Sequence, residues 1–507
     1  MMGRISVIVA AVLTGVLSSS GFAEPARPHV VIILADDLGL GDISGLNPDA
    51  KLNTPHLDRL IERGMAFSDA HSASSVCTPT RYGLLTGRYA WRSPLKEKVL
   101  DAYARPLIPP GRDTLASLLQ RAGYRTALVG KWHLGLGWQT LGGDDHDDPR
   151  RELTGDDVDF ARPFTGGPRE LGFDSWYGVA ASLDFPPYVM IRGDRVERLP
   201  TESRDAQGGR RSDEPQVMMR RGRQAPGFEP EGVMRRLTRE SVGFIEAQSD
   251  ERPFFLLLSL TAPHTPVLPH ADFVGGSDAG IYGDFVQEID WSVGQVLGAL
   301  ERRGLTRDTL VVFTADNGTS RAAFPPELER RYGHATSLGF KGRKGSLDEG
   351  GHRVPLLLQW PAVVPAGGRS GATVNLNDFY ATLAELTNQP VADDAGEDSF
   401  SLLPLLRGEA GAYGRAESIH HDFAGRFAIR RGRWKLLAGK KAGDYRLYDL
   451  QADPSETTDL ADREPDTVRQ LLARMTEIVE RGRSTPGPAR ANDGPAWWPQ
   501  LVWMPRP

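Results

Sequence analysis

The run HVVIILA, from His29 to Ala35, is continuously apolar and rich in β-branched residues. Such a run is typical of a strand that is covered on both faces, as strands of parallel sheets are. Three more short hydrophobic runs predict strands, at 125–129, 254–260 and 310–314. Apolar residues at helical spacing separate them, at 57–61, 115–119 and 286–300. This alternation predicts an α/β fold, in which helices sandwich a large, mostly parallel but mixed sheet.

The pattern changes near Ser399. The segments FAIRRGRWKLLAG and YRLYDL predict neighbouring strands of an antiparallel sheet, and 467–481 predicts a closing helix. We therefore expect a large domain at 24–398 and a smaller C-terminal α+β domain at 399–484. A tail at 485–507, rich in Pro and Trp, should wrap over the surface, with its tryptophans packed at the domain seam.

The amino-acid composition limits the classes of protein to which the chain can belong. The 507 residues include 60 basic and 66 acidic side chains, a net charge of −6, and 40% are hydrophobic. These values indicate a globular protein with a large core, exclude a disordered chain or a polytopic membrane protein, and give no reason to expect a nucleic-acid partner. A single cysteine excludes an internal disulfide and cysteine-rich zinc modules.

The first 23 residues predict a secretory signal peptide. Arg4 precedes an apolar run at 5–17, and the small residues Gly21 and Ala23 suit a cleavage site. The alternative is an N-terminal membrane anchor, but the run is short for a bilayer. We expect cleavage near Ala23, a periplasmic or secreted protein, and no stable membrane insertion.

Two segments carry unusual charge. Eight acidic residues lie between Asp144 and Asp159, and nine arginines lie between Thr201 and Arg239. Both segments are expected to be long surface loops. The arginine-rich segment and the Trp-rich tail are candidates for ligand contacts, with ordinary surface packing as the alternative.

Polar residues follow four of the predicted strands directly. They are Asp36 and Asp37, Lys131 and His133, His264, and Asp316 and Asn317. Since parallel strands place their ligands at their carboxyl ends, these side chains should meet at one edge of the sheet. The acids and the asparagine offer only oxygen ligands, which suit Ca²⁺ or Mg²⁺. The alternative is that the paired acids cap helices or turn loops.

The single cysteine, Cys77, lies in SSVCTPTRYGLLTGRY. Pro79 suits the first turn of a helix, and Arg81 lies four residues after Cys77 on the same helical face. A helix start and a guanidinium bind anions and predict a lowered thiol pKa. A buried, inert thiol is the alternative.

CTPTR matches the Cys-x-Pro-x-Arg signature of the type I, formylglycine-dependent sulfatases of the alkaline-phosphatase-like superfamily. DDLGLGD, GYRTALVGKWHLG, TAPHTP, TADNG and KGSLDEGGHRVP resemble further blocks of that family in the same order, from about Val30 to Ala461. The pattern is most similar to bacterial arylsulfatases and carbohydrate sulfatases.

The resemblance implies that a formylglycine-generating or equivalent maturase oxidises Cys77 to Cα-formylglycine, whose aldehyde hydrates to a geminal diol. One diol oxygen attacks sulfur and displaces the alcohol. The second hydroxyl then loses its proton, and the intermediate collapses to the aldehyde and sulfate.

The resemblance also assigns roles. Asp36, Asp37, Asp316 and Asn317, with the modified Cys77, correspond to ligands of a Ca²⁺ ion, with Mg²⁺ as the alternative. Arg81 corresponds to the residue that holds the hydrate. Lys131 and Lys344 correspond to sulfate-binding lysines. His133 corresponds to the base that removes the diol proton, and His264 to the group that assists the leaving oxygen. Ser182 corresponds to a residue that hydrogen-bonds the hydrated nucleophile. Lys341 and Arg343 flank Lys344, which is chosen because it directly precedes GSLDEGG.

These inferences predict a sulfuric ester hydrolase that acts on a sulfated small molecule or glycan, and also on aryl sulfates. One alternative is a phosphomonoester or phosphonate ester hydrolase of the same superfamily. The other is an inactive, Ca²⁺-dependent binder of sulfated glycans in which Cys77 remains a thiol.

Overall fold

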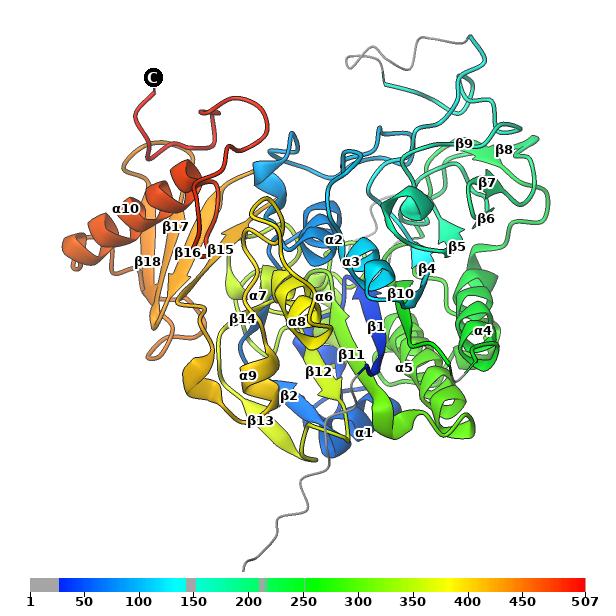
Figure 1. Cartoon of the computed structure of the whole chain (residues 1–507), viewed down its shortest axis with the longest axis horizontal. Coiled ribbons are helices and arrows are strands. Elements are labelled where there is room, and N and C mark those ends of the chain that lie inside the picture. Colours follow the sequence, from blue (N-terminus) through cyan, green and yellow to red (C-terminus); the bar gives the residue numbers. More distant parts are fainter. Residues whose placement is uncertain (1–26, 143–151, 209–214, 216, 250, 507) are drawn as a thin grey trace, which may run out of the picture.

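The structure is a computed structural model that describes residues 27–142, 152–208, 215, 217–249 and 251–506. The predicted signal peptide and much of the acidic segment after Asp144 lie outside these residues. Its main feature is a ten-stranded mixed sheet within the described part, flanked on one side by a smaller sheet (Figure 1).

The main sheet has the order β13-β2-β12-β11-β1-β10-β4-β5-β6-β7. These strands are β1 (His29–Asp36), β2 (Met65–Phe67), β4 (Arg125–Lys131), β5 (Ser175–Val179), β6 (Ile191–Arg192), β7 (Arg195–Val196), β10 (Phe254–Pro263), β11 (Thr309–Ala315), β12 (Leu356–Gln359) and β13 (Gly368–Ser370). The central strands β11, β1, β10, β4 and β5 run parallel, and β12 and β6 pair antiparallel at either side. The predicted mixed, largely parallel sheet is confirmed.

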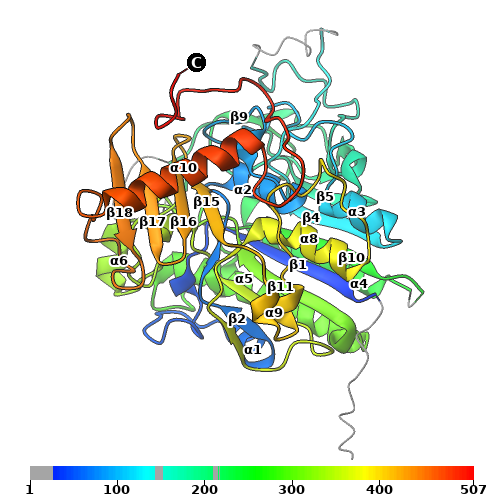
Figure 2. The same ribbon diagram turned by 60° about the vertical axis from the view of Figure 1, so that its left-hand side comes forward.

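Helices cover both faces of this sheet (Figure 2). One face carries α1 (Pro55–Arg63), α4 (Val233–Glu246) and α5 (Gly280–Arg302), and the other carries α2 (Cys77–Thr86), α3 (Leu115–Arg121) and α8 (Phe379–Leu386). Short helices α6 (Pro326–Tyr332), α7 (Glu349–His352) and α9 (Leu403–Leu406) lie in the connections. The central strand β1 is buried from Val30 onward, which explains its unbroken apolar sequence. None of the described helices is long and apolar enough to cross a membrane.

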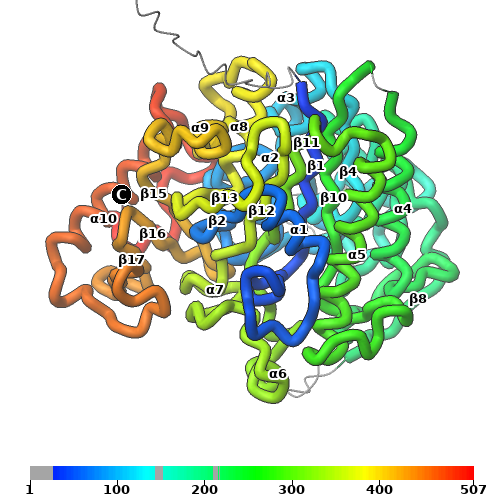
Figure 3. Tube along the Cα trace, turned by 90° about the horizontal axis from the view of Figure 1, so that it is seen from below, coloured from blue at the N-terminus to red at the C-terminus, as the bar shows by residue number. Residues whose placement is uncertain are grey.

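The C-terminal part lies to one side of the main sheet (Figure 3). Four strands form an antiparallel sheet in chain order: β15 (Glu417–His421), β16 (Phe427–Arg431), β17 (Trp434–Ala438) and β18 (Tyr445–Asp449). Helix α10 (Pro465–Arg481) packs on this sheet with Met475 and Ile478. The predicted antiparallel sheet and closing helix are confirmed.

The expectation of a long loop at 201–239 is wrong in part. Strand β8 (Glu202–Arg204) pairs with β9 (Gly222–Gln224), and helix α4 begins at Val233. Arg235, Arg236 and Arg239 therefore lie on a helix, not in a loop. The arginines hid the helix because they occupy its outer side, while Val233, Met234 and Leu237 are buried. The remaining small sheet pairs β3 (Ala70–His71) with β14 (Val374–Asn375).

Tryptophans of the tail pack at the seam between the two parts, as expected. Trp498 is buried and lies near the rings of Trp91 and Phe427. This packing joins the tail to the C-terminal sheet and to the segment after α2.

Candidate functional site

Four neighbouring strands deliver polar side chains to one edge of the main sheet. Asp36 ends β1 and Asp37 follows it, Lys131 ends β4, His264 follows β10, and Asp316 and Asn317 follow β11. Because β11, β1, β10 and β4 are adjacent in the sheet, their carboxyl ends meet at one place. Cys77, the first residue of α2, faces the same place.

Arg81 holds the two outer strands of this group together. Its Nε and Nη2 both donate to Asp316 Oδ2, at 3.0 and 2.8 Å. Its Nη1 donates to Ser259 Oγ at 2.5 Å and to the Lys131 carbonyl at 3.2 Å. Arg81 and Asp316 are buried, so their charges balance each other without water. Ser259, which sequence reasoning missed, is an inconspicuous serine within a hydrophobic strand.

Each of the paired acids accepts a hydrogen bond from a lysine. Lys131 Nζ donates to Asp36 Oδ2 at 2.7 Å, and Lys344 Nζ donates to Asp37 Oδ1 at 2.6 Å. Lys344 Nζ also lies 3.2 Å from Cys77 Sγ. Burial raises the pKa of both carboxyls, but the nearby cations outweigh it, so both pKa values lie below the ordinary range.

Three buried oxygens at this edge accept no hydrogen bond: Asp36 Oδ1, Asp37 Oδ2 and Asn317 Oδ1. Leaving such atoms unpaired is costly, unless a cation binds them. Asp316 differs, since its Oδ2 accepts from Arg81 and its Oδ1 from the Asp37 backbone amide, at 3.1 Å. The chemistry of the donor set therefore fits a hard divalent cation, with ligand atoms of Asp36, Asp37, Cys77 and His264 close to one another.

Asp37 and His133 have backbone φ angles of 65° and 61°. This left-handed conformation is uncommon for residues other than glycine and is characteristic of functional sites. In both cases it occurs where a strand leaves the sheet, and it turns the chain sharply toward the site.

The Cys77 thiol does not have the lowered pKa that the sequence predicts. Burial raises the pKa of Cys77 to about 12, more than Lys131 and Lys344 lower it. The sequence correctly indicates the helix start and the nearby cations, but it cannot show that the thiol is 1% exposed. As an unmodified side chain, Cys77 is therefore a poor nucleophile.

The two histidines lie on different sides of the cysteine. His264 Nε2 is 3.7 Å from Asp37 Oδ2, and its Nδ1 is 2.5 Å from the Thr265 carbonyl. His133 Nε2 lies 2.8 Å from the Leu100 carbonyl, and its Nδ1 has no hydrogen-bond partner. Burial, together with Lys131 and Arg81, holds the pKa of His133 well below its usual range, so this imidazole is neutral.

A cleft of about 440 Å³ opens above Cys77. Five of the predicted site residues line it: Cys77, His133, Ser182, His264 and Lys344. Arg81 and Lys131 are not among its lining residues; they lie buried beneath it, paired with Asp316 and Asp36. The Ser182 hydroxyl has no hydrogen-bond partner. Met218 and Arg220 of the arginine-rich segment also line the cleft, whereas none of its lining residues comes from the Trp-rich tail. Asp184, Phe185, Arg321 and Phe423 are among its other lining residues and carry no sequence signal.

Comparison with known proteins identifies the family. A family model described as Sulfatase matches residues 28–389, which include every strand-end residue of the site. The chain belongs to the sulfatase family. A second model, described as N-sulphoglucosamine sulphohydrolase, C-terminal, matches residues 343–484.

Named relatives agree with this assignment. The sulfatase is 31% identical over 499 residues to an N-acetylgalactosamine-6-O-sulfatase of Bacteroides thetaiotaomicron, covering 90% of this chain and 94% of the relative. It is 32% identical to the N-acetylgalactosamine-6-sulfatase of Mus musculus, over 78% of this chain and 70% of the relative. A solved structure from a study of glycosaminoglycan metabolism by B. thetaiotaomicron superposes with a TM-score of 0.78 at 29% identity, covering 90% of this chain and 99% of that one. The protein is thus an enzyme, a sulfuric ester hydrolase, as predicted.

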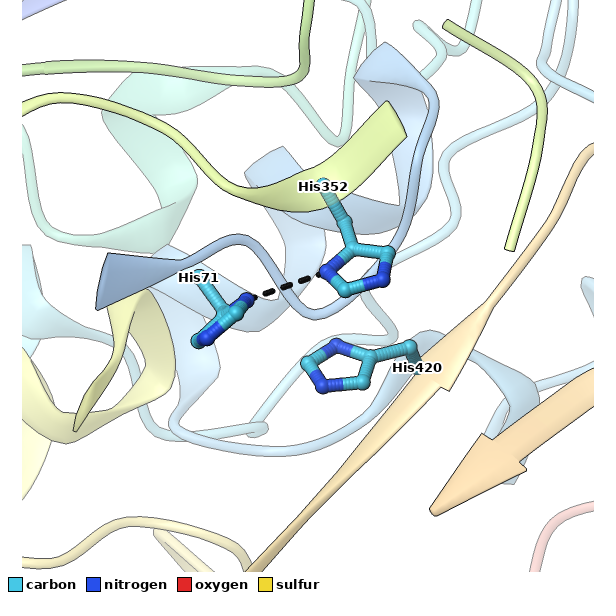
Figure 4. A group of neighbouring side chains, drawn as sticks. All are labelled: His71, His352 and His420. Carbon is cyan, nitrogen blue, oxygen red and sulfur yellow. Dashed lines mark hydrogen bonds between the residues drawn. The ribbon is translucent and has the colours of Figure 1, made fainter. Parts of the chain in front are cut away.

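A second histidine cluster brings together His71 of β3, His352 of α7 and His420 of β15 (Figure 4). His71 and His352 approach each other with their Nδ1 atoms at 3.0 Å, and His420 stacks on His352 with ring centroids 3.8 Å apart. Lys435 Nζ lies 3.1 Å from His352 Nε2 and 2.9 Å from Glu349 Oε1. The buried lysine already supplies a positive charge, so this cluster is a structural network that joins the C-terminal sheet to β3 and α7.

Proposed function

We propose that this sulfatase removes sulfate from a sulfated carbohydrate, with formylglycine made from Cys77 as its nucleophile and Ca²⁺ as its metal. The carbohydrate class is supported by the relatives named for N-acetylgalactosamine sulfate esters. Conversion of Cys77 is supported by its signature CTPTR, and by a buried thiol whose own pKa is too high for it to act as a thiolate.

Asp36, Asp37 and Asn317 would hold the cation through their unpartnered oxygens, and Asp316, fixed by Arg81, would complete the carboxylate set. The hydrated formylglycine supplies an oxygen nucleophile, and the cation supplies Lewis acidity and charge neutralisation. Hard oxygen ligands are consistent with Ca²⁺ and also with Mg²⁺.

The chain's own cations bind the sulfate. A sulfate monoester is an anion at all physiological pH values, so its pocket needs fixed positive charge. Lys344 borders the cleft and reaches both Cys77 and Asp37, while Lys131 donates a hydrogen bond to Asp36. Arg81 keeps Asp316 oriented, and the unpartnered Ser182 hydroxyl faces the same cavity.

The histidines have different environments, which suits separate tasks. His133 is buried and neutral, with an unpartnered Nδ1 that can accept a proton at the cysteine side of the cleft. His264 lies beside Asp37, where its imidazole can assist the departing alcohol oxygen.

We also infer export, because residues 1–23 have the pattern of a secretory signal peptide. The enzyme would then act in the periplasm or outside the cell, after a maturase has modified Cys77. Fractionation of the native host, with N-terminal sequencing of the mature chain, tests this inference.

The observation that carries the proposal is the position of Lys344 Nζ, between Cys77 Sγ and Asp37 Oδ1. Cys77, Lys344 and Asp37 are thus in direct contact, which supports their proposed roles as modified residue, sulfate-binding cation and metal ligand. Mass spectrometry of the tryptic peptide that contains Cys77, from protein made in its own host, should show the lighter aldehyde form. An intact thiol in an active preparation would contradict the proposal.

The same superfamily geometry serves phosphate esters, so a minor phosphatase activity is expected. Matched 4-nitrophenyl sulfate and 4-nitrophenyl phosphate separate the two activities. A strong preference in kcat/KM for the phosphate would overturn the sulfate assignment.

A further inference from the structure

The mouth of the cleft above Cys77 carries more positive charge than one sulfate group requires. Lys344 is engaged at the base with Cys77 and Asp37. Two arginines, Arg220 and Arg321, also line the cleft, and Asp184 is its one carboxylate among the described lining residues. We propose that Arg321, Arg220 and Phe423 form a second subsite, which binds an anionic sugar next to the sulfated one.

Arg321 provides this subsite with a positive charge that has no ion-pair partner among the described residues. It is exposed, and it makes no hydrogen bond, ion pair or ring contact with any described residue. It lies four residues after the predicted metal ligand Asn317, in the segment that leaves β11. A guanidinium fixed on this segment and open to the cleft is well placed to bind a carboxylate or sulfate in a bidentate manner.

Arg220 approaches from a distant part of the chain, just before β9. Its guanidinium lies 3.5 Å from the centroid of the Phe185 ring, and its Nη2 is 3.5 Å from Asp184 Oδ2. The ring contact orients the guanidinium, while the side chain remains 46% exposed. Because the contact with Asp184 is an ion pair without a hydrogen bond, the Arg220 guanidinium can donate to a second anion.

Phe423 provides an apolar surface on the same cleft. It lies in the turn between β15 and β16, and its side chain is 46% exposed although it is aromatic. Its carbonyl accepts a hydrogen bond from the Lys98 amide at 2.8 Å, which ties the turn to the main domain. A methyl group built on Gly345 would lie 3.7 Å from Phe423 Cβ, so the turn borders the Lys344 segment. Exposed aromatic rings stack on sugar rings.

Three separate segments thus place two cations and one aromatic ring around the entrance, beyond the groups that act on sulfate. A neutral monosaccharide sulfate would leave Arg321 unused. The ligand that fits is an acidic oligosaccharide, with a carboxylate or second sulfate on the residue next to the sulfated sugar. This inference rests on the proposed action on sulfated carbohydrates.

The test measures competitive inhibition of 4-nitrophenyl sulfate hydrolysis by a matched pair of disaccharides. One links 6-O-sulfo-N-acetylgalactosamine to glucuronic acid, and the other has the uronate carboxyl reduced to an alcohol. We expect the acidic disaccharide to bind about five- to tenfold more tightly to the wild type, since one charged hydrogen-bonded contact is lost on reduction. Added NaCl should reduce this preference.

Single-residue variants test which side chains cause the preference for the acidic disaccharide. Arg321→Gln should lower the preference for the acidic disaccharide to about twofold or less, because the charged contact is lost. Phe423→Ala should weaken both disaccharides alike, by about threefold, because stacking does not depend on the carboxylate. Arg469→Gln is the matched control, since Arg469 is an exposed arginine of α10 outside the cleft, and it should keep the wild-type preference.

A third disaccharide, with a second sulfate in place of the carboxylate, shows whether the subsite prefers a carboxylate or a sulfate. Tighter binding of either acidic disaccharide than of the reduced one supports the subsite. Equal inhibition by all three disaccharides would overturn it, as would an unchanged preference in Arg321→Gln. If neither 4-nitrophenyl sulfate nor any of the sulfated disaccharides releases sulfate, the proposed function fails instead. Calorimetric titration with the same disaccharides would then still measure the charge preference.

Discussion

Cys77 lines the catalytic cleft at the first residue of α2, and its side chain is small. Replacing it with alanine removes the atom that must become the aldehyde, but it opens little space in the core. We expect Cys77→Ala to lose all measurable sulfatase activity and to retain a melting temperature within a few degrees of the wild type. Both are measured on one preparation, by 4-nitrophenyl sulfate hydrolysis and thermal unfolding. Near-full activity would contradict the mechanism.

Lys341 and Lys344 lie in the same short segment of the sequence, but their side chains have different surroundings. Lys344 contacts Asp37 and Cys77, whereas Lys341 Nζ contacts the Glu456 carbonyl at 3.1 Å, away from the cleft. We expect Lys344→Ala to lower kcat/KM by about 100-fold or more, as loss of a preorganised charge-stabilising group does.

Lys341→Ala is the matched control. It removes the same charge from the same segment, and we expect kcat/KM within about threefold of the wild type, because surface charges contribute little. A larger loss in Lys341→Ala than in Lys344→Ala would mean that the sequence-based choice of the sulfate-binding lysine is wrong.

At the scale of elements, the sequence predicts best where burial is uniform. Strand β1 is covered on both faces, so its apolar run is unambiguous, and the acids that follow it are found at the strand end. Helix α4 was missed because its outer side carries arginines, so its composition resembles that of a charged loop. The contacts of Arg81 with Ser259, and of Phe423 with the cleft, join residues far apart in the chain. No local pattern encodes such contacts.

A buried ion network at the histidine cluster joins the C-terminal sheet to α7. Lys435 of β17 pairs with Glu349 of α7 and with Glu456, each at 2.9 Å, and all three side chains are buried. Removing the lysine leaves the buried Glu456 carboxylate without its cation, and it leaves Glu349 with only the Arg353 ion pair. We expect Lys435→Ala to destabilise the protein by about 3–5 kcal/mol.

Denaturant unfolding, followed by tryptophan fluorescence, measures this loss. Lys440→Ala, at an exposed position after β17, is the control and should change the midpoint little. An unchanged midpoint in Lys435→Ala would show that the network does not hold the C-terminal sheet to α7.

At the scale of the whole molecule, we expect the bound metal ion to support both the activity and the thermal stability of the protein. Asp36 and Asp37 come from β1 and Asn317 from the segment after β11, so a shared cation stabilises the folded arrangement of both. We expect chelation to lower both activity and melting temperature, and Ca²⁺ to restore them. Restoration by Mg²⁺ and not by Ca²⁺ would reassign the ion, and no effect of thorough chelation on either property would argue against the site.

We expect the folded protein to lose stability in acid, because several of its histidines are buried in the neutral form. Burial lowers the pKa of His421 to about 4, and holds those of His352 and His420 well below the ordinary value. The unfolded chain protonates these groups near pH 6.5 and the folded chain does not. Stability is therefore fully present above about pH 6.5 and falls as the pH drops below it.

For His421 alone the difference of about 2.5 pKa units corresponds to about 3 kcal/mol, lost progressively between about pH 6.5 and pH 4. Denaturant midpoints measured across this range should fall with pH in the wild type and fall less steeply in His421→Gln, which cannot take up the proton. Both proteins are compared at each pH, so effects of other groups cancel. If the two slopes are equal, His421 already carries a proton in the folded state, or the acid sensitivity originates elsewhere in the seam.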